Sequence, residues 1–402
     1  MSQIHDGSAQ PADRGNLVYL IMVMQGIGIL MPWNIFINAK SYFEDYKLND
    51  TTVQEYRQNF MSYIAMASQY PNFFMSIVNI FCQCGRSGVC VVTSIVIMVL
   101  VFIVTVVLAF IDSSNWSAEF FWITLALAVV LNGACGIYQN SMLGATANLP
   151  VKYTNAVIFG NNLSGTFFGF ANILAIALAP DIKTSAIYFF VTAIVVLLVA
   201  LGAYFMLSAT KFYRYFQHKQ FQKKPNIAVY WKVLKEIWYL ALCEWFVFFV
   251  SLSLFPQIQS NVKRLHLPIS DTYWTPVFCF LSFNLFAMLG NLFTECLRFP
   301  GPRWVCIPVF LRVGFIPLFL MCNFRPDDRE WTVLIDNDYV FVVAGAFMAF
   351  TSGYFGSLVM MYAPKRVTDK KNAGVAGVIM VLFLVLGFLS GINVSRLLAM
   401  LV

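Results

Sequence analysis

The chain has 402 residues, of which 59% are hydrophobic, 17% are aromatic and only 11% are charged, with a formal net charge of +7. A soluble protein of this length carries charge on about a quarter of its residues, and it cannot hide apolar runs of about 20 residues repeated along its whole length. The composition therefore excludes a soluble globular protein and predicts an all-α polytopic membrane protein.

A hydropathy window of about 19 residues locates the membrane spans. It finds eleven of them, at residues 17–39, 60–82, 88–111, 118–143, 155–179, 184–210, 233–256, 273–297, 303–323, 338–362 and 374–400. A long polar connection separates six spans from five, which predicts two helical bundles that rock around a site near mid-membrane. The predicted parts are an N-terminal tail at 1–16, a six-helix bundle at 17–210, a basic linker at 211–232 and a five-helix bundle at 233–402.

Loop charges set the predicted orientation. Basic residues are more numerous in the connections that share a side with the N-terminus, and the positive-inside rule makes that side cytoplasmic. An odd number of spans then places the C-terminus outside. Asn49, in the sequon Asn49-Asp50-Thr51, falls in a long outside loop and is a predicted glycosylation site. We expect no cleaved signal peptide, and the plasma membrane as the location.

The linker carries the sequence KFYRYFQHKQFQKK, which is basic and aromatic. Such a stretch is typical of a helix lying on an anionic lipid surface. We therefore expect the lipid bilayer, and not nucleic acid, as its partner.

Polar residues inside the first span form the most informative stretch, GIGILMPWNIFINAKSYF, where Pro32, Trp33 and Asn34 interrupt an apolar run. An amide beside a helix-kinking proline is costly in a bilayer unless it lines a polar path or bonds a neighbouring helix. Both explanations fit this stretch taken alone.

The fourth and fifth spans contain further amides. Gln139 follows Asn132 by two helical turns, so both can face one cavity, although hydrogen bonds between helices explain Asn132 equally well. Asn161 and Asn162 lie between glycines in the run 160–165. This pattern is typical of a bending gate or of close helix packing.

Ionisable residues are rare within the spans. Glu244 lies about mid-span, and an intramembrane carboxylate indicates a proton or cation site unless it is neutral or paired with Arg312. Asn284 and Asn291 are two helical turns apart on one face.

Catalytic motifs are lacking throughout the sequence. There is no phosphate-binding glycine loop, no zinc-protease pair and no nucleophile elbow, and the three histidines have no ligand-spaced partners. We therefore predict that the protein is not an enzyme, needs no metal or cofactor, and runs any transport on existing gradients.

Several motifs together resemble the equilibrative nucleoside transporter family over essentially the full length. They are the first-span stretch, QNSMLGATANLP, LFPQI, FCFLSFNLF, RWVCIPVFLRVGFIPLFLMCN and SGYFGSLVMMYAPKRV, in that order. The resemblance implies an eleven-helix fold related to the major facilitator architecture, and facilitated diffusion of nucleosides, often also of nucleobases, by alternating access.

The resemblance also implies roles for single residues. Trp33 would pack against the substrate near the base, Ile37 would tune substrate and inhibitor fit, and Gln139 would hydrogen-bond the base edge. Asn34 would support a first helix bent at Pro32.

The chain departs from the family pattern in the eighth span. Family members commonly carry an aspartate and an arginine there that bind sugar hydroxyls, and this sequence has Ala287 and Asn291 at those positions. An alanine and an amide cannot offer the same charge-assisted bonds, each worth about 1.5–3 kcal/mol. The departure leaves open a same-fold transporter that prefers nucleobases or organic cations, proton-linked through Glu244; a non-transporting membrane receptor is a further alternative.

Overall fold

A computed structural model of the chain describes residues 12–50, 53–82, 88–146, 149–218, 227–326, 329, 332–369 and 372–401. Most of the expected N-terminal tail and residues 219–226 of the expected linker lie outside the described residues. Long helices account for most of the described chain, and its one pairing of extended residues is an isolated bridge between Val262 and Phe324. The predicted all-α class is therefore confirmed.

The long helices lie close to the predicted spans. Their bounds are α1 Leu17–Asn38, α3 Phe60–Cys82, α4 Gly88–Phe110, α5 Ser117–Thr146, α6 Val151–Leu178, α7 Ile182–Ala209, α9 Ile227–Leu254, α11 Ser282–Cys296, α14 Asp338–Arg366 and α15 Ala373–Met400. Shorter elements are η1 Arg14–Asn16, η2 Tyr42–Lys47, α2 Gln54–Gln58, α8 Lys211–His218, η5 Gln259–Asn261, α10 Asp271–Trp274, η6 Thr275–Leu281, α12 Cys306–Leu311, η7 Arg312–Gly314 and α13 Phe315–Met321.

Eight of the described helical segments are long and apolar enough to cross a bilayer. They are Arg14–Asn38, Gly88–Phe110, Ser117–Thr146, Ile182–Ala209, Ile227–Asn261, Asp271–Cys296, Asp338–Arg366 and Ala373–Met400. Helices α3 and α6 are as long but carry more polar residues, and Cys306–Met321 is a shorter apolar segment. The chain is therefore a multi-pass membrane protein, and the number of eleven spans stays a prediction.

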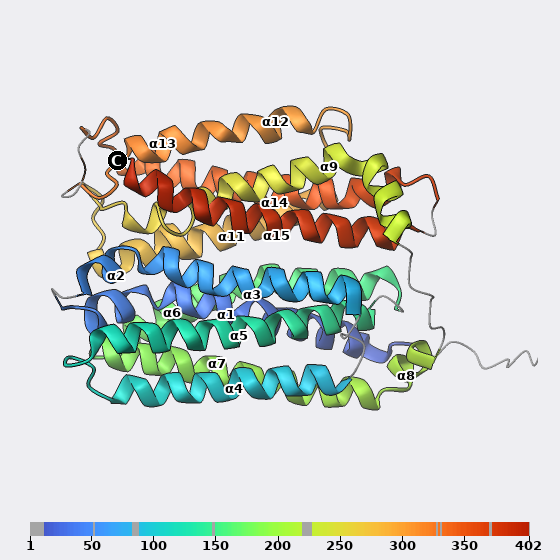
Figure 1. The fold of residues 1–402 in the computed structure, drawn as a ribbon, viewed down its shortest axis with the longest axis horizontal. Helices are drawn as coiled ribbons and strands as arrows, with labels where there is room; N and C mark the ends of the chain where they lie inside the picture. Colours follow the sequence, from blue (N-terminus) through green and yellow to red (C-terminus); the bar gives the residue numbers. More distant parts are fainter. Residues whose placement is uncertain are drawn as a thin grey trace, which may run out of the picture.

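The helices lie side by side in two groups in Figure 1. The lower group contains α1 and α3 to α7, with α1 packed on α6 and α7, and α5 packed on α3 and α4. The upper group contains α9 and α11 to α15, with α9 packed on α15 and α11 packed on α14. The two groups meet where α3 packs on α15 and where α6 packs on α11 and η6.

Glycines bring helix backbones into direct contact within the lower group. A Cβ atom on Gly26 of α1 would lie 2.2 Å from the carbonyl oxygen of Val157, and one on Gly160 of α6 would lie 2.1 Å from that of Val23. The hydroxyl of Ser164 donates to the carbonyl oxygen of Ile27 at 2.9 Å and ties the same two helices together. The glycine-rich run 160–165 therefore serves close packing, since α6 continues through it unbroken.

The ninth predicted span is interrupted. Instead of one helix over 303–323, two short helices, α12 and α13, flank the 3-10 turn η7 that begins at Arg312. Pro317 cannot donate a backbone hydrogen bond to the carbonyl of Val313, which favours a tighter turn there. The interruption lies at the one arginine that this segment carries between 304 and 321.

The short helix α8 begins the predicted basic linker. The hydroxyl oxygen of Thr210 accepts a hydrogen bond from the backbone N–H of Tyr213 at 3.3 Å and caps the helix start. Phe212 is buried against Tyr153, with 5.1 Å between ring centroids, while Lys211 and Arg214 are exposed. This helix is therefore amphipathic, with aromatic rings toward the protein and basic side chains outward.

Candidate functional site: the contact between the two helix groups

Helix α1 carries Pro32 without a break. It is one α-helix from Leu17 to Asn38, and the buried side chain of Asn34 donates to the carbonyl oxygen of Leu30 at 3.0 Å. Asn38 does the same to the carbonyl of Asn34 at 2.8 Å. Each of these two amides therefore bonds the turn preceding it and reinforces the helix around the proline, while its side-chain oxygen has no partner in the described structure.

Trp33 lies where both helix groups meet. Its half-buried side chain packs on a small apolar cluster made of Ala65 of α3, Leu252 of α9 and Ile392 of α15. Ile37, one turn further along, is fully buried in the core that includes the lower group. The contacts of Trp33 therefore depend on how the two groups are placed relative to each other. Ile37 is fully buried, so it can contact a ligand only after the packing around it changes.

On helix α5, Gln139 follows two residues, Asn132 and Tyr138, whose side chains form hydrogen bonds to other helices. Asn132 donates to the hydroxyl of Ser68 at 3.1 Å, so it serves interhelical bonding, as one of the two explanations predicts. The buried Tyr138 donates to the side-chain oxygen of Gln25 at 2.6 Å. Gln139 is half-buried, and among the described residues its amide has no hydrogen-bond partner, which leaves both its donor and its acceptor free for a ligand.

Helix α3 carries two buried amide side chains that were not predicted as site residues from the sequence. The side-chain oxygens of Gln69 and Asn72 are buried without a described partner, and the oxygen of Asn72 would lie 3.3 Å from a Cβ on Gly136 of α5. They flank Pro71, just as Trp33 and Asn34 follow Pro32. The same signal, polar residues beside a proline inside an apolar run, therefore marks both helices.

Helices α6 and α11 touch across the two groups. A Cβ atom on Gly165 would lie 1.9 Å from the side-chain oxygen of Asn284, so only glycine permits this approach. The Asn284 amide donates to the carbonyl of Phe280 at 2.9 Å, which holds it against its own helix. Asn161 has a buried oxygen without a described partner one turn earlier on α6, and Asn162 is half-buried.

Ala287 and Asn291 continue the face of Asn284 along α11. Both are half-buried, and the carbonyl oxygen of Ala287 would lie 1.9 Å from a Cβ on Gly353 of α14, so its backbone is pressed against that helix. This stretch of the contact therefore offers a methyl group and an amide, without the charges that bind hydroxyl groups most strongly.

Arg312 lies in a polar cradle of neutral groups. It is 3% exposed and donates to the carbonyls of Val247 and Met348, at 2.6 and 3.1 Å, and to the hydroxyls of Ser251 and Thr351, at 2.9 and 3.2 Å. These contacts join η7 to α9 and α14. The expected alternative of an ion pair with Glu244 is not formed, because every described partner of the guanidinium is neutral.

Glu244 is fully buried one turn before Val247 on α9. Neither carboxyl oxygen has a hydrogen-bond partner among the described residues. A charged carboxylate in such surroundings is costly, so the neutral form fits this packing. Glu244 and the Arg312 cradle are therefore separate features of the upper group.

Polar contacts join the two groups at the end that also carries η2 and α2. The Lys40 ammonium donates to the carbonyl of Ser260 and to the side-chain oxygen of Asn261, both at 2.8 Å. Arg396 of α15 lies 3.5 Å from the Tyr63 hydroxyl of α3 and 5.2 Å from its ring centroid. The two groups are therefore fastened together at this end.

Metal chemistry has no described basis in this structure. Within the residues that the structure describes, no group of three histidine, cysteine, aspartate or glutamate side chains is placed to hold a metal ion. The candidate site therefore consists of organic side chains, namely amides, an indole and apolar groups.

Comparisons with known proteins show which family the chain is similar to. The family model described as nucleoside transporter matches residues 125–225 and 218–400. Equilibrative nucleoside transporter 1 of Homo sapiens is 31% identical, over 96% of this chain and 97% of its own. Equilibrative nucleoside transporter 3 of Rattus norvegicus is 28% identical, over 96% of this chain and 89% of its own. Equilibrative nucleoside transporter 2 of Homo sapiens is 29% identical, over 96% of this chain and 97% of its own.

One solved structure shows a remote similarity. It is described as a bacterial homologue of the human drug peptide transporters, and it is 12% identical with a TM-score of 0.43, over 95% of this chain and 97% of its own. The family model alone covers more than half of the residues, and the human relative matches nearly the whole length. The chain belongs to the equilibrative nucleoside transporter family.

Proposed function

We propose that this protein carries nucleosides across a membrane by facilitated diffusion with alternating access. The observation that carries the proposal is the near full-length match to relatives named equilibrative nucleoside transporters, at 28–31% identity. The family is one of transporters, so the protein is not an enzyme.

Trp33 and Gln139 are the proposed base-binding residues. Trp33 offers an indole face at the meeting point of the two groups, and Gln139 keeps its amide donor and acceptor free. A nucleobase is a planar heterocycle with adjacent donors and acceptors, so stacking and a bidentate amide contact suit it.

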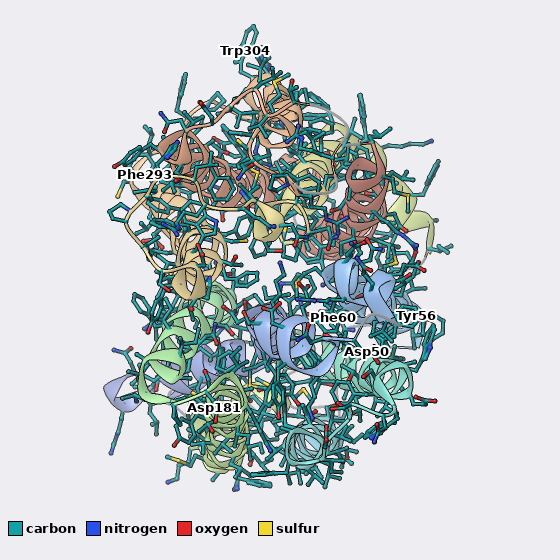
Figure 2. The ribbon with its side chains drawn as sticks, turned by 90° about the vertical axis from the view of Figure 1, so that its left-hand side faces the viewer. Asp50, Tyr56, Phe60, Asp181, Phe293 and Trp304 are labelled. Carbon is teal, nitrogen blue, oxygen red and sulfur yellow. The ribbon has the colours of Figure 1, made fainter. Side chains whose placement is uncertain are left out.

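The two helix groups are the proposed moving units, with the N-terminus in the cytoplasm and the C-terminus outside. In this assignment the contacts of Lys40 with Ser260 and Asn261 lie at the extracellular end, which supports a state closed to the outside. Figure 2 views the molecule from that end, where Asp50 and Asp181 are labelled. Asn161, Asn162 and Arg312 are proposed to support the packing that changes between states.

Asn49 is proposed to be glycosylated, in a protein of the plasma membrane. Its side chain is exposed in the loop between η2 and α2, and its oxygen accepts a hydrogen bond from Arg57 at 3.0 Å. The side-chain nitrogen, which is the acceptor of the sugar, is not used in that bond.

Ribose recognition is proposed to rely on neutral groups. Ala287 and Asn291 stand in place of a charged pair on α11, after Asn284, so sugar hydroxyls would form ordinary hydrogen bonds with the two amides. The alternative preference for nucleobases or organic cations rests on these residues and on Glu244 alone, and the relatives' names give it no support.

Uptake by the purified protein in proteoliposomes tests the proposal. We expect radiolabelled adenosine and uridine to enter well above protein-free vesicles, and uptake to fall at least tenfold in Trp33→Ala and in Gln139→Ala. Trp238→Ala is the matched control, because that indole is 60% exposed on α9 and should not affect transport. Background uptake of both nucleosides would refute the proposed function, and uptake of free bases or amines alone would favour the alternative.

A further inference from the structure

A hollow of about 540 Å³ lies beside the end of α14, away from the contact between the two groups. The connection 301–304, between α11 and α12, forms one wall. Tyr362, Lys365 and Arg366, in the last turns of α14, form the other. Neither the base-binding residues nor the Arg312 cradle belongs to this pocket.

The pocket carries three basic side chains. Arg303 and Lys365 are exposed, and neither forms an ion pair or side-chain hydrogen bond with any described residue. Arg366 lies over the ring of Tyr239, with its guanidinium carbon 5.9 Å from the ring centroid. Its N–H groups have no hydrogen-bond acceptor among the described residues. The nearby Glu236 accepts the backbone N–H of Thr368 at 2.7 Å. The lining residues therefore present three positive charges, none of which forms an ion pair with a described residue.

The helix dipole explains only part of this cluster. Lys365 and Arg366 lie in the last turn of α14, where basic side chains complement the partial negative charge of a helix end. Arg303 belongs to a different element and reaches the same pocket from the opposite wall. Basic side chains from two elements therefore line the same pocket.

Tyrosines of α14 hold the backbone beneath Arg303 in place. The hydroxyl of Tyr362 donates toward the carbonyls of Arg298 and Pro300, at 3.1 and 3.0 Å. The hydroxyl of Tyr354 accepts the backbone N–H of Phe299 at 3.1 Å. The wall that carries Arg303 is thus fixed before any ligand arrives, which lowers the ordering cost of binding.

Exposed aromatic side chains flank the pocket. Trp304 is 66% exposed and Phe299 is 70% exposed, and Trp304 projects from the edge of the molecule in Figure 2. Tryptophan is enriched where a membrane protein crosses the boundary between headgroups and hydrocarbon. In the proposed orientation this end faces the cytoplasmic leaflet, which holds the anionic lipids.

We propose that this pocket binds the phosphate-bearing headgroup of an anionic membrane lipid. Arg303, Lys365 and Arg366 contact the phosphate oxygens, because guanidinium groups form paired N–H bonds with phosphate and lysine adds a point charge. Phe299 and Trp304 contact the upper part of the acyl chains. The proposal rests on the proposed orientation and not on the transported substrate.

Thermal unfolding of the full chain in a neutral detergent tests this assignment through intrinsic tryptophan fluorescence. The probes are short-chain phosphatidylinositol bisphosphate, short-chain phosphatidylcholine, inositol trisphosphate and inorganic phosphate. The test variant combines Arg303→Gln, Lys365→Gln and Arg366→Gln. The control combines Arg14→Gln, Lys152→Gln and Lys235→Gln, which removes the same charge from exposed positions outside both the pocket and the basic linker 211–232.

We expect the bisphosphate lipid to raise the melting temperature of the wild type and of the control, with half-saturation at similar concentrations. Each basic residue near an anionic surface contributes about a factor of five, so the test variant should need roughly a hundredfold more lipid. Phosphatidylcholine should have no effect. If the test variant fails to fold, Lys365→Gln alone, at an exposed position, should still weaken binding about fivefold.

Equal lipid responses in the test variant and the control would overturn the proposal, since they would indicate general surface charge. Inositol trisphosphate or inorganic phosphate acting at the same concentrations as the lipid would contradict the assignment to a membrane lipid. Because this assay does not measure transport, its failure is distinct from failure of the proposed transport function.

Discussion

Gly165 of α6 lies directly against Asn284 of α11, so that a Cβ atom added to Gly165 would come within 1.9 Å of the amide oxygen and 2.9 Å of the Asn284 Cβ. The two residues belong to different helix groups, and Asn284 leads the face that continues through Ala287 and Asn291. A state in which the groups separate here must break this contact.

Adding a methyl group at Gly165 should therefore disfavour the contacting state. We expect Gly165→Ala to destabilise that state by about 1–3 kcal/mol through overpacking and to slow nucleoside uptake severalfold. Gly202→Ala on α7 is the matched control, because no neighbouring atom lies within 4 Å of its added Cβ. Equal uptake by the two variants would show that the contact does not limit transport.

Restoring charges on α11 tests the account of ribose recognition. We expect Ala287→Asp combined with Asn291→Arg to raise the preference for nucleosides over free bases at least tenfold, since each charge-assisted bond is worth about 1.5–3 kcal/mol. The measurement is competition of uridine and uracil for labelled uridine uptake. Ala287→Asn with Asn291→Gln supplies similar bulk without charge. An unchanged preference in the charged variant would contradict the account.

Arg312 should be a major source of stability for the upper group. Arg312→Gln removes a side chain that donates hydrogen bonds to four groups on α9 and α14. We expect this change to lower the free energy of unfolding by about 2–4 kcal/mol, which a lower melting temperature in detergent would show. Arg312→Lys should rescue little, because an ammonium cannot span the same set of acceptors. Arg214→Gln on the exposed face of α8 is the control; an equal loss there would argue against the cradle.

The Glu44 carboxyl should make the stability of the end that carries η2 and α2 sensitive to pH. Burial raises the pKa of Glu44 from 4.5 to about 7, although Lys40, 3.5 Å away, opposes that rise. The folded protein therefore favours the protonated carboxyl. Its contribution to stability is present below pH 4.5 and is lost as the pH rises through 7.

Glu44→Gln should accordingly flatten this pH dependence. We expect the variant to match the wild type near pH 5 and to melt at a higher temperature near pH 8, where the wild type must bury a charge. Melting curves across this range measure the difference. Parallel pH profiles for the two proteins would contradict the assignment to Glu44.

Helix positions were largely predictable because apolar runs in a membrane protein report directly on its spans. Helix α3 lies at Phe60–Cys82, as the hydropathy window predicts. The polar surroundings of Arg312 were not predictable from hydropathy, since the flanking residues are apolar and the groups that accept its hydrogen bonds lie on the distant helices α9 and α14. Tertiary contacts between distant segments decide such features.

The sequence indicated which residues are candidates for the site, but it did not indicate which hydrogen bonds and contacts their side chains make. Polar residues near prolines marked Trp33 and Asn34, and the same rule would have found Gln69 and Asn72 around Pro71. Sequence spacing could not show that Asn34 bonds its own helix while Gln139 keeps a free amide, because both are amides within apolar runs. The surroundings of each amide depend on which neighbouring helix approaches it.

The most direct test of facilitated exchange is counterflow in proteoliposomes without any ion gradient. Vesicles preloaded with unlabelled uridine should transiently accumulate external labelled uridine above its equilibrium level, and Trp33→Ala should abolish that overshoot. Labelled uridine that binds to the protein but shows no overshoot, or an overshoot that appears only with an imposed proton gradient, would contradict the account.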